Sequence, residues 1–384
     1  MNDVLLIALQ KRGGGALDAS GLSNGLCDNR FRHTIIVSTG NEHPDEFNEN
    51  EYRRTVRIET YGGSMRSFLA HTLFLRRPLR LIDAIRRARP AIVHVIHFHP
   101  WDVFVFMLRP FMGYQIVYGV QEDPYSRKDA NNPAVMGPLE RMFVRRADLV
   151  APYSEFMKRE LARHVPESKL VPIFAGDYRR WYPAFAHKGF HMSGPLRLFF
   201  FGPIKGYKGV DVLVNALEIC RRNGVNVRLT IAGMQSPSTH ILEPEVVHRL
   251  GITWVDRFLS QEEVAHHMED ADVMVIPYRH ATQTTPGLLA ITYGLPAIGT
   301  RTGGLSEQIE DGVNGLLAAP GDPESLAGAI WRIEKDRSLL KKFSAGARGL
   351  YRTKFNWDMI AARAIKEVYG QLLTAPSAVP KSVQ

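Results

Sequence analysis

Short apolar runs alternate with longer amphipathic stretches along most of the chain. Runs this short and uniformly apolar are typical of strands buried on both faces of a parallel sheet. Between the runs, apolar residues recur every three or four positions, as at residues 210–217, which predicts helices with one core-facing side. The pattern therefore predicts an α/β protein. Its strands are expected at residues 4–9, 33–38, 54–59, 91–98, 116–120, 148–152, 196–201, 227–232, 273–277 and 297–300.

The strands and helices occur in two successive sets. Residues 166–195 separate the sets, are rich in proline, glycine and aromatic side chains, and are the expected interdomain linker. We therefore predict two Rossmann-like domains, residues 1–175 and 190–355, facing each other across a cleft. A helix is expected from Asn356 to residue 373, and residues 374–384 are expected to form a disordered tail.

Helix start signals mark a possible phosphate site after the strand at 273–277. Thr285 followed by Pro286 is an N-cap and first-turn pair, and Gly294 ends the helix. A helix that begins at a strand's carboxyl end points unpaired N–H groups and a partial positive charge at the sheet edge. The next strand leads into Gly303 and Gly304, where a backbone without side chains can lie against a ligand.

Other N-caps are equally recognisable. Ser154 precedes a helix expected at 155–164, and Ser260 with Glu263 has the sequence of a capping box for a helix ending at residue 270.

The loop after the strand at 196–201 combines glycines with two lysines. Lys205 and Lys208 lie beside Gly202 and a helix start, and they can meet a diphosphate as point charges. Lys208 is expected on the surface at the end of this loop. Gly233 repeats the strand-then-glycine pattern after the strand at 227–232.

A glycine turn is also predicted after the first strand, at residues 13–15. The sequence is neither G-x-G-x-x-G nor a Walker motif, so Gly14 and Gly15 indicate either close backbone approach to a ligand or a plain flexible turn. The missing fingerprint also disfavours the alternative of a dinucleotide-dependent oxidoreductase.

Polar residues follow two further strands of the first half. His94, His97 and His99 do not converge on a metal, because alternate strand residues face opposite ways. His97 or His99 could instead hydrogen-bond a substrate hydroxyl, or serve a structural role. Asp123 could orient a sugar or a base, or cap the next turn. No metal site is predicted.

The composition predicts that the protein binds an anionic partner. The 384 residues carry a formal charge of +9 with 23% charged side chains, which suits a nucleotide, a phosphorylated lipid or an anionic membrane surface. Residues 67–89 are expected to form a basic helix, either simply solvated or drawn to anionic lipid. The basic residues lack the interleaved aromatic side chains of a nucleic-acid platform, so no nucleic-acid partner is expected.

The same composition bears on location. The sequence contains two cysteines, which favours a reducing cytoplasm, with peripheral attachment to the inner face of the cytoplasmic membrane as a further expectation. The apolar run at 91–106 is interrupted by polar residues and proline, so no membrane-spanning helix is predicted.

Three segments carry a family resemblance. Residues 199–211 (FFFGPIKGYKGVD), 271–278 (ADVMVIPY) and 294–316, with its GLP, GG and EDGVNGL sequences, resemble glycosyltransferase family 4, the retaining sugar transferases of GT-B fold. The spacing holds over roughly residues 145–370. The resemblance implies a nucleotide-diphosphate sugar donor, no cofactor, diphosphate contacts from Lys208 and Lys205, and a last helix that crosses back to the N-terminal domain. Candidate catalytic residues are His99, Lys208 and Lys205, and candidate binding residues are Gly14, Gly15, His97, Asp123, Gly202, Gly233, Tyr278, Gln283, Thr284, Thr285, Gly304 and Glu307.

One departure from the family pattern affects the donor site. The family commonly has two glutamates ahead of the Gly-Leu-Pro turn, and the corresponding positions here are Ala281 and Leu289. The sequence Thr282-Gln283-Thr284-Thr285 is similar to that of a family branch with Thr/Ser-Gln-Ser-Gly, and residues 283–285 are expected to replace the glutamate contacts. A catalytically impaired homologue that still binds nucleotide sugar is the alternative.

The expected activity follows from the leaving group. Lysines and helix N-termini stabilise the charge that develops on a departing nucleoside diphosphate without a nucleophilic side chain. Closing two domains over the donor would exclude water. We expect transfer to a saccharide acceptor, lipid-linked, in bacterial-type polysaccharide or glycolipid biosynthesis.

Overall fold

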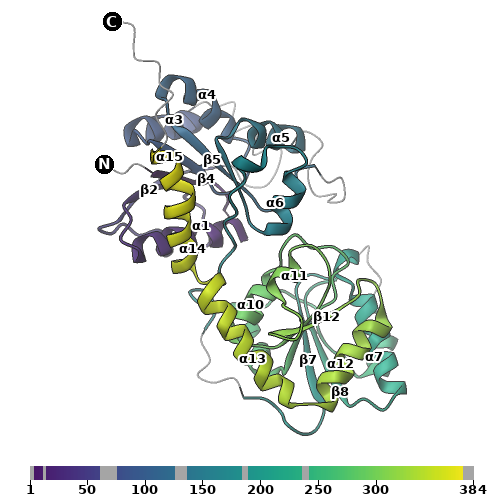
Figure 1. The fold of residues 1–384 in the computed structure, drawn as a ribbon. Coiled ribbons are helices and arrows are strands. Elements are labelled where there is room, and N and C mark those ends of the chain that lie inside the picture. The colour runs from purple at the N-terminus through teal and green to yellow at the C-terminus, as the bar shows by residue number, and fades with distance from the viewer. Residues whose placement is uncertain are drawn as a thin grey trace, which may run out of the picture. The chain divides into compact units, whose positions relative to one another are not determined.

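The computed structural model describes residues 4–11, 14–60, 76–125, 136–183, 189–235 and 242–374 (Figure 1). The chain divides into two compact units. Unit 1 comprises Met1–Gly176 and Asn356–Gln384, and unit 2 comprises Asp177–Phe355. Each unit is built on its own parallel sheet, so the α/β class predicted from the apolar runs is confirmed.

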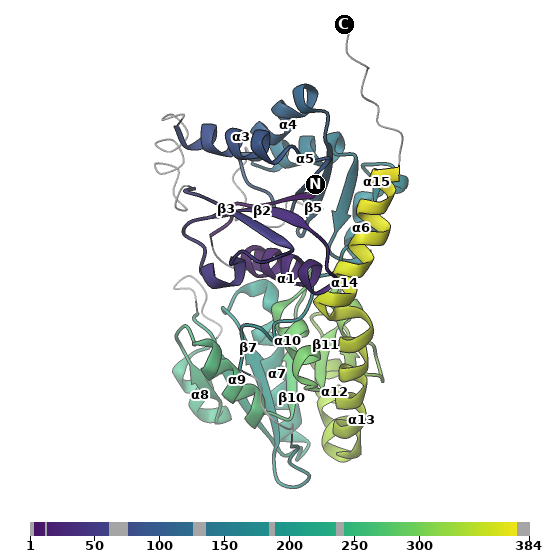
Figure 2. The same cartoon turned by 90° about the vertical axis from the view of Figure 1, so that its left-hand side faces the viewer.

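Unit 1 contains a six-stranded parallel sheet in the order β3-β2-β1-β4-β5-β6. The strands are β1 (Val4–Ala8), β2 (His33–Ser38), β3 (Arg53–Ile58), β4 (Ile92–Val95), β5 (Gln115–Val120) and β6 (Leu149–Pro152). The strand order reverses between β1 and β4. Figure 2 shows α1 (Gly14–Asp28) on one face of this sheet and α3 (Arg76–Ala88), α4 (Asp102–Met112) and α5 (Met136–Arg146) on the other. Helices on both faces explain why most strand residues are buried, whereas the edge strand β3 keeps exposed polar positions.

The end of the chain packs into unit 1. Asn356 caps α14 (Trp357–Arg363) by accepting a hydrogen bond from the Met359 amide (2.8 Å), and a π-helical segment (Ala364–Tyr369) leads into α15 (Gly370–Thr374). A Cβ atom added to Gly21 of α1 would lie 2.0 Å from the Trp357 ring, and one added to Gly25 would lie 2.4 Å from the Trp357 carbonyl oxygen. The glycines of α1 therefore allow α14 to approach closely.

Unit 2 contains a second six-stranded parallel sheet, in the order β12-β11-β10-β7-β8-β9. Its strands are β7 (Leu196–Phe201), β8 (Val227–Ala232), β9 (Thr253–Val255), β10 (Val273–Ile276), β11 (Ala297–Thr300) and β12 (Gly315–Ala318). Its helices are α7 (Val210–Arg222), α8 (Pro244–Leu250), α9 (Gln261–Asp270), α10 (Thr285–Tyr293), α11 (Leu305–Gln308), α12 (Pro323–Lys335) and α13 (Ser338–Leu350). The strand order reverses between β7 and β10, and such switch points are where ligands bind in α/β sheets.

Most predicted elements are confirmed, and several boundaries change. The Ser260–Glu263 capping box and the Ser154 cap are present, but the helix after Ser154, α6 (Glu155–Leu161), ends before residue 164. The glycine turn predicted at 13–15 is wrong at Gly14 and Gly15, which are the first residues of α1. Of the basic helix predicted at 67–89, residues 67–75 lie outside the described residues, as do residues 375–384 of the predicted tail. Within the described part of the chain, no helix is long and apolar enough to cross a membrane.

Candidate functional site

The switch point of unit 2 brings two loops together. Strands β7 and β10 pair directly through Leu198–Val273 and Phe199–Met274, so the loops that follow them, 202–209 and 277–284, leave the sheet side by side. The helices α7 and α10 begin at the ends of these loops. Their unpaired N–H groups and partial positive charges therefore lie at this edge of the sheet, as the cap pattern predicted.

Lys208 is buried here rather than lying on the surface, which corrects the prediction. It ends a 3-10 turn (Gly206–Lys208), its side chain is 8% exposed, and its Nζ lies 5.3 Å from the centre of the Tyr278 ring. Burial, and after it the positive charge of Lys205, lowers the pKa of Lys208 from 10.5 to about 8.

Among the described residues, no counter-charge lies beside the Lys208 ammonium. No carboxylate lies within 4.0 Å of its Nζ, and no hydrogen bond reaches it, among the residues that the structure describes. A buried cation without a partner costs free energy, and an anion bound beside it would recover part of that cost. Lys205, half-buried at the start of the same turn, is close enough to affect Lys208 electrostatically.

Gly202 and Gly233 allow the loops around Lys208 to pack closely. Gly202 has φ +120°, and a Cβ atom there would lie 2.6 Å from the Lys208 Nζ. Gly233 has φ +155°, and its Cβ would lie 2.1 Å from the Gly202 carbonyl oxygen. Both glycines were predicted as ligand contacts, and the structure shows that packing between protein atoms already requires them.

Residues 283–285 differ in what their side chains contact. Thr284 is held by contacts within the protein, whereas Gln283 and Thr285 can contact a ligand. Thr284, rather than Thr285, is the N-cap of α10, since its Oγ1 accepts a hydrogen bond from the Gly287 amide (3.0 Å). The same hydroxyl donates to Oε1 of Gln308 (2.9 Å), a residue that the sequence analysis missed. The side chains of Gln283 and Thr285 are half-buried and make no hydrogen bond within the described residues.

The remaining unit 2 candidates lie on the same edge. Tyr278 is buried beneath Lys208, and its carbonyl oxygen accepts a hydrogen bond from the Thr300 hydroxyl. Gly304 precedes α11 and donates its N–H to the Ala281 carbonyl oxygen (3.2 Å), and Glu307 is half-buried on α11. The glycine turn after β11 is thereby tied to the loop after β10.

The switch point of unit 1 gathers His97, Gly15 and a buried carboxylate. A Cβ atom on Gly15 would lie 2.1 Å from Oε1 of Gln10 and 2.8 Å from the His97 ring. On the other side, the His97 ring stacks on Tyr153 with centroids 5.2 Å apart. Asp18 of α1 is 1% exposed, its Oδ2 lies 3.3 Å from His97 Nε2, and neither of its oxygens accepts a hydrogen bond within the described residues. Asp18 was not predicted, because nothing in the sequence joins it to His97.

His99 is a neutral imidazole. Burial, and after it the charge of Lys11, lowers the pKa of His99 from 6.5 to about 3. Its Nδ1 accepts a hydrogen bond from the Trp101 amide (3.1 Å), so the ring proton resides on Nε2. The His99 amide donates in turn to Oδ2 of Asp102 (2.7 Å), the first residue of α4.

Acidic residues gather at the carboxyl end of β5. Asp123 accepts a hydrogen bond from the Tyr125 amide (2.9 Å), which is the turn-capping alternative left open by the sequence. Burial, followed by the charges of Glu122 and Asp123, raises the pKa of Glu140 from 4.5 to about 8. In the described ranges, no three histidine, cysteine or acidic side chains are grouped to hold a metal ion.

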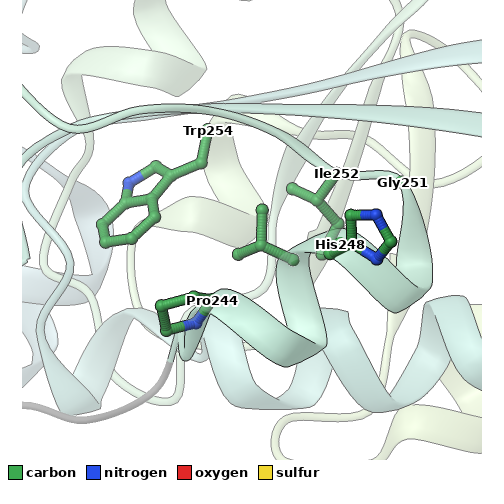
Figure 3. Close-up of a pocket in the computed structure, with 6 residues that line it drawn as sticks. Pro244, His248, Gly251, Ile252 and Trp254 are labelled. Atoms are coloured by element: carbon green, nitrogen blue, oxygen red, sulfur yellow. The ribbon is translucent and has the colours of Figure 1, made fainter.

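A separate cavity of about 540 Å³ lies at the edge of the unit 2 sheet (Figure 3). It is lined mostly by apolar atoms of α8 and β9, with Trp254 on one side and His248 and Ile252 on the other. Strand β9 is the edge strand, separated from β7 by β8. This cavity therefore lies away from the switch point, and the residues that line it include no lysine.

Comparisons with known proteins agree with this arrangement. Residues 12–176 match the family model described as Glycosyltransferase Family 4, and residues 195–336 match the one described as Glycosyl transferases group 1. Glycogen synthase from Mycobacterium tuberculosis is 27% identical over 328 residues, covering 81% of this chain and 77% of that protein.

Two solved structures share the fold. Sucrose-phosphate synthase from Thermosynechococcus elongatus has a TM-score of 0.74 at 19% identity and covers 98% of this chain and 100% of that one. Anabaena HepE, in complex with UDP and glucose, has a TM-score of 0.71 at 15% identity and covers 96% of this chain and 100% of that one.

The two parallel-sheet domains and these likenesses define a glycosyltransferase of GT-B fold, of the hexosyltransferase type. The two matches together extend over most of both units, and the chain belongs to glycosyltransferase family 4. The fold and family predicted from the motifs at 199–211, 271–278 and 294–316 are therefore confirmed.

Proposed function

We propose that this enzyme is a retaining glycosyltransferase whose donor is a nucleotide-diphosphate sugar. The observation that carries the proposal is the buried Lys208 ammonium at the switch point of unit 2, which has no counter-charge among the described residues. A diphosphate supplies that charge. HepE, which shares the fold, was solved with UDP and glucose, and UDP is accordingly the first ligand to test.

The proposed chemistry rests on stabilising the leaving group. As the glycosidic bond breaks, negative charge grows on the diphosphate oxygen, and Lys208 with Lys205 and the α7 and α10 N-termini are positioned to stabilise it. A lysine with a pKa near 8 is mostly protonated at neutral pH, and a bound diphosphate favours that charged form further. No protein nucleophile is needed for this step.

Other residues are proposed to contact the sugars. In unit 2, the amide of Gln283 and the hydroxyl of Thr285, which make no hydrogen bond to another described residue, suit the hydroxyls of the transferred sugar. In unit 1, His97 and His99 follow β4 at the carboxyl edge of the sheet, where a sugar hydroxyl would find imidazole nitrogens. We propose no metal and no cofactor other than the donor.

Thermal denaturation with nucleotides tests donor binding. A ligand that binds only the folded state at a hundred times its Kd adds about 2.7 kcal/mol of stability. We expect UDP, GDP or ADP to raise the melting temperature of the wild-type protein and of Lys341→Met, which alters an exposed lysine of α13. Lys208→Met is expected to show a smaller shift, and an undiminished shift in Lys208→Met would contradict the proposal. The anomeric configuration of the transferred sugar, read by proton NMR, tests retention.

The acceptor is proposed to be a saccharide linked to a lipid in an anionic membrane. Helix α4 presents Phe111 (86% exposed) and Met107 to solvent beside a cavity of about 1050 Å³, which is also lined by Leu372 and Leu373. Helix α3, which packs against α4, contains five arginines and one acidic residue. Exposed apolar side chains beside basic ones suit a bilayer surface of negative charge. Such an acceptor fits the building of a bacterial polysaccharide or glycolipid at the inner face of the cytoplasmic membrane.

Vesicle flotation tests this surface. We expect the protein to float with vesicles that contain phosphatidylglycerol and to remain unbound with phosphatidylcholine alone. Phe111→Glu is expected to abolish flotation, whereas Phe258→Glu, at an exposed phenylalanine of unit 2, is a matched control that retains it. Equal binding by both variants would contradict the assignment.

A catalytically impaired homologue is the second candidate, because Ala281 and Leu289 occupy the positions of the two family glutamates. Leu289 is fully buried within α10, so a side chain that packs the core has replaced one acid. Nucleotide-sugar binding without transfer or donor hydrolysis would favour this candidate over the active enzyme.

A further inference from the structure

Arg279 connects the two loops of the unit 2 switch point. Its backbone N–H donates to the Tyr207 carbonyl oxygen (2.7 Å), and its Nη1 donates to the Gly206 carbonyl oxygen (2.7 Å). Its guanidinium also holds the Asp211 carboxylate with two bonds, of 2.8 and 2.5 Å. Arg279, a single residue in the loop after β10, therefore binds both the turn that contains Lys208 and the first turn of α7.

The turn that contains Lys208 has little internal support. Its own backbone bonds are from Lys208 N–H to the Lys205 carbonyl oxygen (2.9 Å) and a longer one from Gly209 N–H to the Gly206 carbonyl oxygen (3.4 Å). A single 3-10 turn with such bonds does not fix its own position. Arg279 supplies two external hydrogen bonds to this turn, to the Gly206 and Tyr207 carbonyl oxygens, and its two bonds to Asp211 tie it at the same time to the start of α7.

We propose that Arg279 and Asp211 are positioning residues for Lys208. The pair holds the 206–208 turn so that the ammonium stays between Gly202 and the face of the Tyr278 ring. The inference rests on the proposed function, in which Lys208 receives the diphosphate, and it assigns no substrate contact to Arg279. Since the fork of an arginine matches a carboxylate in two places, lysine at position 279 cannot reproduce the contact.

The solvent exposure of Arg279 and Asp211 indicates that the pair positions the 206–208 turn rather than stabilising the whole domain. The Arg279 and Asp211 side chains are 34% and 40% exposed, and pairs so open to water contribute little to the stability of a domain. Substituting either residue is therefore expected to leave the unit folded while releasing the turn. Arg249 offers a matched control, because it pairs with Glu218 of α7 at 2.5 Å without a bond to residues 205–209.

The first test measures UDP affinity by calorimetry. We expect Kd to rise about tenfold in Arg279→Ala and Asp211→Asn, and to rise also in Arg279→Lys, with no change in Arg249→Ala. In a Lys208→Met background, Arg279→Ala is expected to have no further effect. An additive loss would show that Arg279 acts on UDP independently of Lys208 and would overturn the inference. If Lys208→Met itself leaves the affinity of UDP unchanged, the proposed function fails instead.

The second test needs no ligand and no activity. The pH dependence of Lys208 acylation, read by mass spectrometry of the peptide, reports the pKa of its amine. Releasing the turn hydrates the ammonium, so we expect this pKa to rise above about 8 in both Arg279→Ala and Asp211→Asn. Charge alone would move the two variants in opposite directions, because one loses a cation and the other an anion. A lower pKa in Asp211→Asn, with circular dichroism showing an intact fold, would overturn the positioning role.

Discussion

Replacing Lys208 with methionine should stabilise the protein while weakening donor binding. Methionine keeps an unbranched side chain of similar length beside Tyr278 and removes the buried charge. The pKa of Lys208 falls from 10.5 to about 8 on folding, which corresponds to about 3 kcal/mol at 1.36 kcal/mol for each tenfold change in the protonation equilibrium. At pH 7 this is the free energy that the folded state loses by holding the ammonium out of water.

Because folding lowers the pKa of Lys208, the stability of the wild-type protein depends on pH in a defined direction. Between about pH 8 and pH 10.5 the unfolded chain binds the Lys208 proton more tightly than the folded protein does, so wild-type stability rises with pH in this window. Below pH 8 both states are protonated and the full cost is present. The advantage of Lys208→Met should therefore be largest at pH 7 and should shrink as the pH rises toward 10.

Urea denaturation followed by tryptophan fluorescence, at pH 7 and at several values up to 10, measures this difference. We expect Lys208→Met to exceed the wild type by up to about 3 kcal/mol at pH 7, and Lys341→Met to match the wild type throughout. If Lys208→Met is less stable than the wild type at pH 7, or if its difference from the wild type is independent of pH, the reasoning about a buried unpaired ammonium is refuted.

Three further substitutions test other contacts. Gly233→Ala places a Cβ 2.1 Å from the Gly202 carbonyl oxygen at φ +155°, and we expect urea denaturation to show a loss of about 2 kcal/mol or more, against a slight gain for Gly328→Ala, where nothing lies within 4 Å. Thr284→Ala removes the α10 cap and one partner of Gln308, so stability should fall by about 1 to 2 kcal/mol, while Thr284→Ser should retain most of it. Asp18→Asn alters the carboxyl group whose Oδ2 lies 3.3 Å from His97 Nε2, and we expect kcat to fall at least about tenfold in a transfer assay without loss of stability, an outcome that equal activity would contradict.

Local patterns were sufficient to predict most of the sheet positions. The runs at 33–38, 196–201, 227–232 and 297–300 coincide with β2, β7, β8 and β11, because strands covered by helices on both faces are mostly apolar in sequence. Capping residues such as Ser260 were equally visible, since their partners lie within three positions.

Helix α1 was missed because its periodicity is hidden. Almost every residue from Gly15 to Leu26 is buried, including Asp18, Ser20 and Asn24, so no polar face marks the helix. Of the glycines that suggested a turn, Gly15 is required by the close approach of Gln10 and of His97, which follows a strand far along the chain. No local signal connects positions so distant, and tertiary packing overrode propensity.

The sequence was sufficient to predict which loop forms the candidate site, but not which residues contact one another there. The lysines and glycines of residues 202–209 mark the loop, but the burial of Lys208 depends on Tyr278, from the loop after β10. Asp18, Arg279 and Gln308 were missed for the same reason, since each acts on a partner in a different loop. Thr284 and Thr285 are equally good caps by composition, and the contact with Gln308 distinguishes them.

Proton uptake on UDP binding tests the central claim most directly. Calorimetry at pH 8 in buffers of different ionisation enthalpy counts the protons that bind with the nucleotide. Because the pKa of Lys208 is about 8 and a neighbouring diphosphate raises it, we predict uptake of about half a proton by the wild type and none by Lys208→Met. UDP binding without uptake, or with the same uptake in Lys208→Met, would contradict the assignment of Lys208 to the leaving diphosphate.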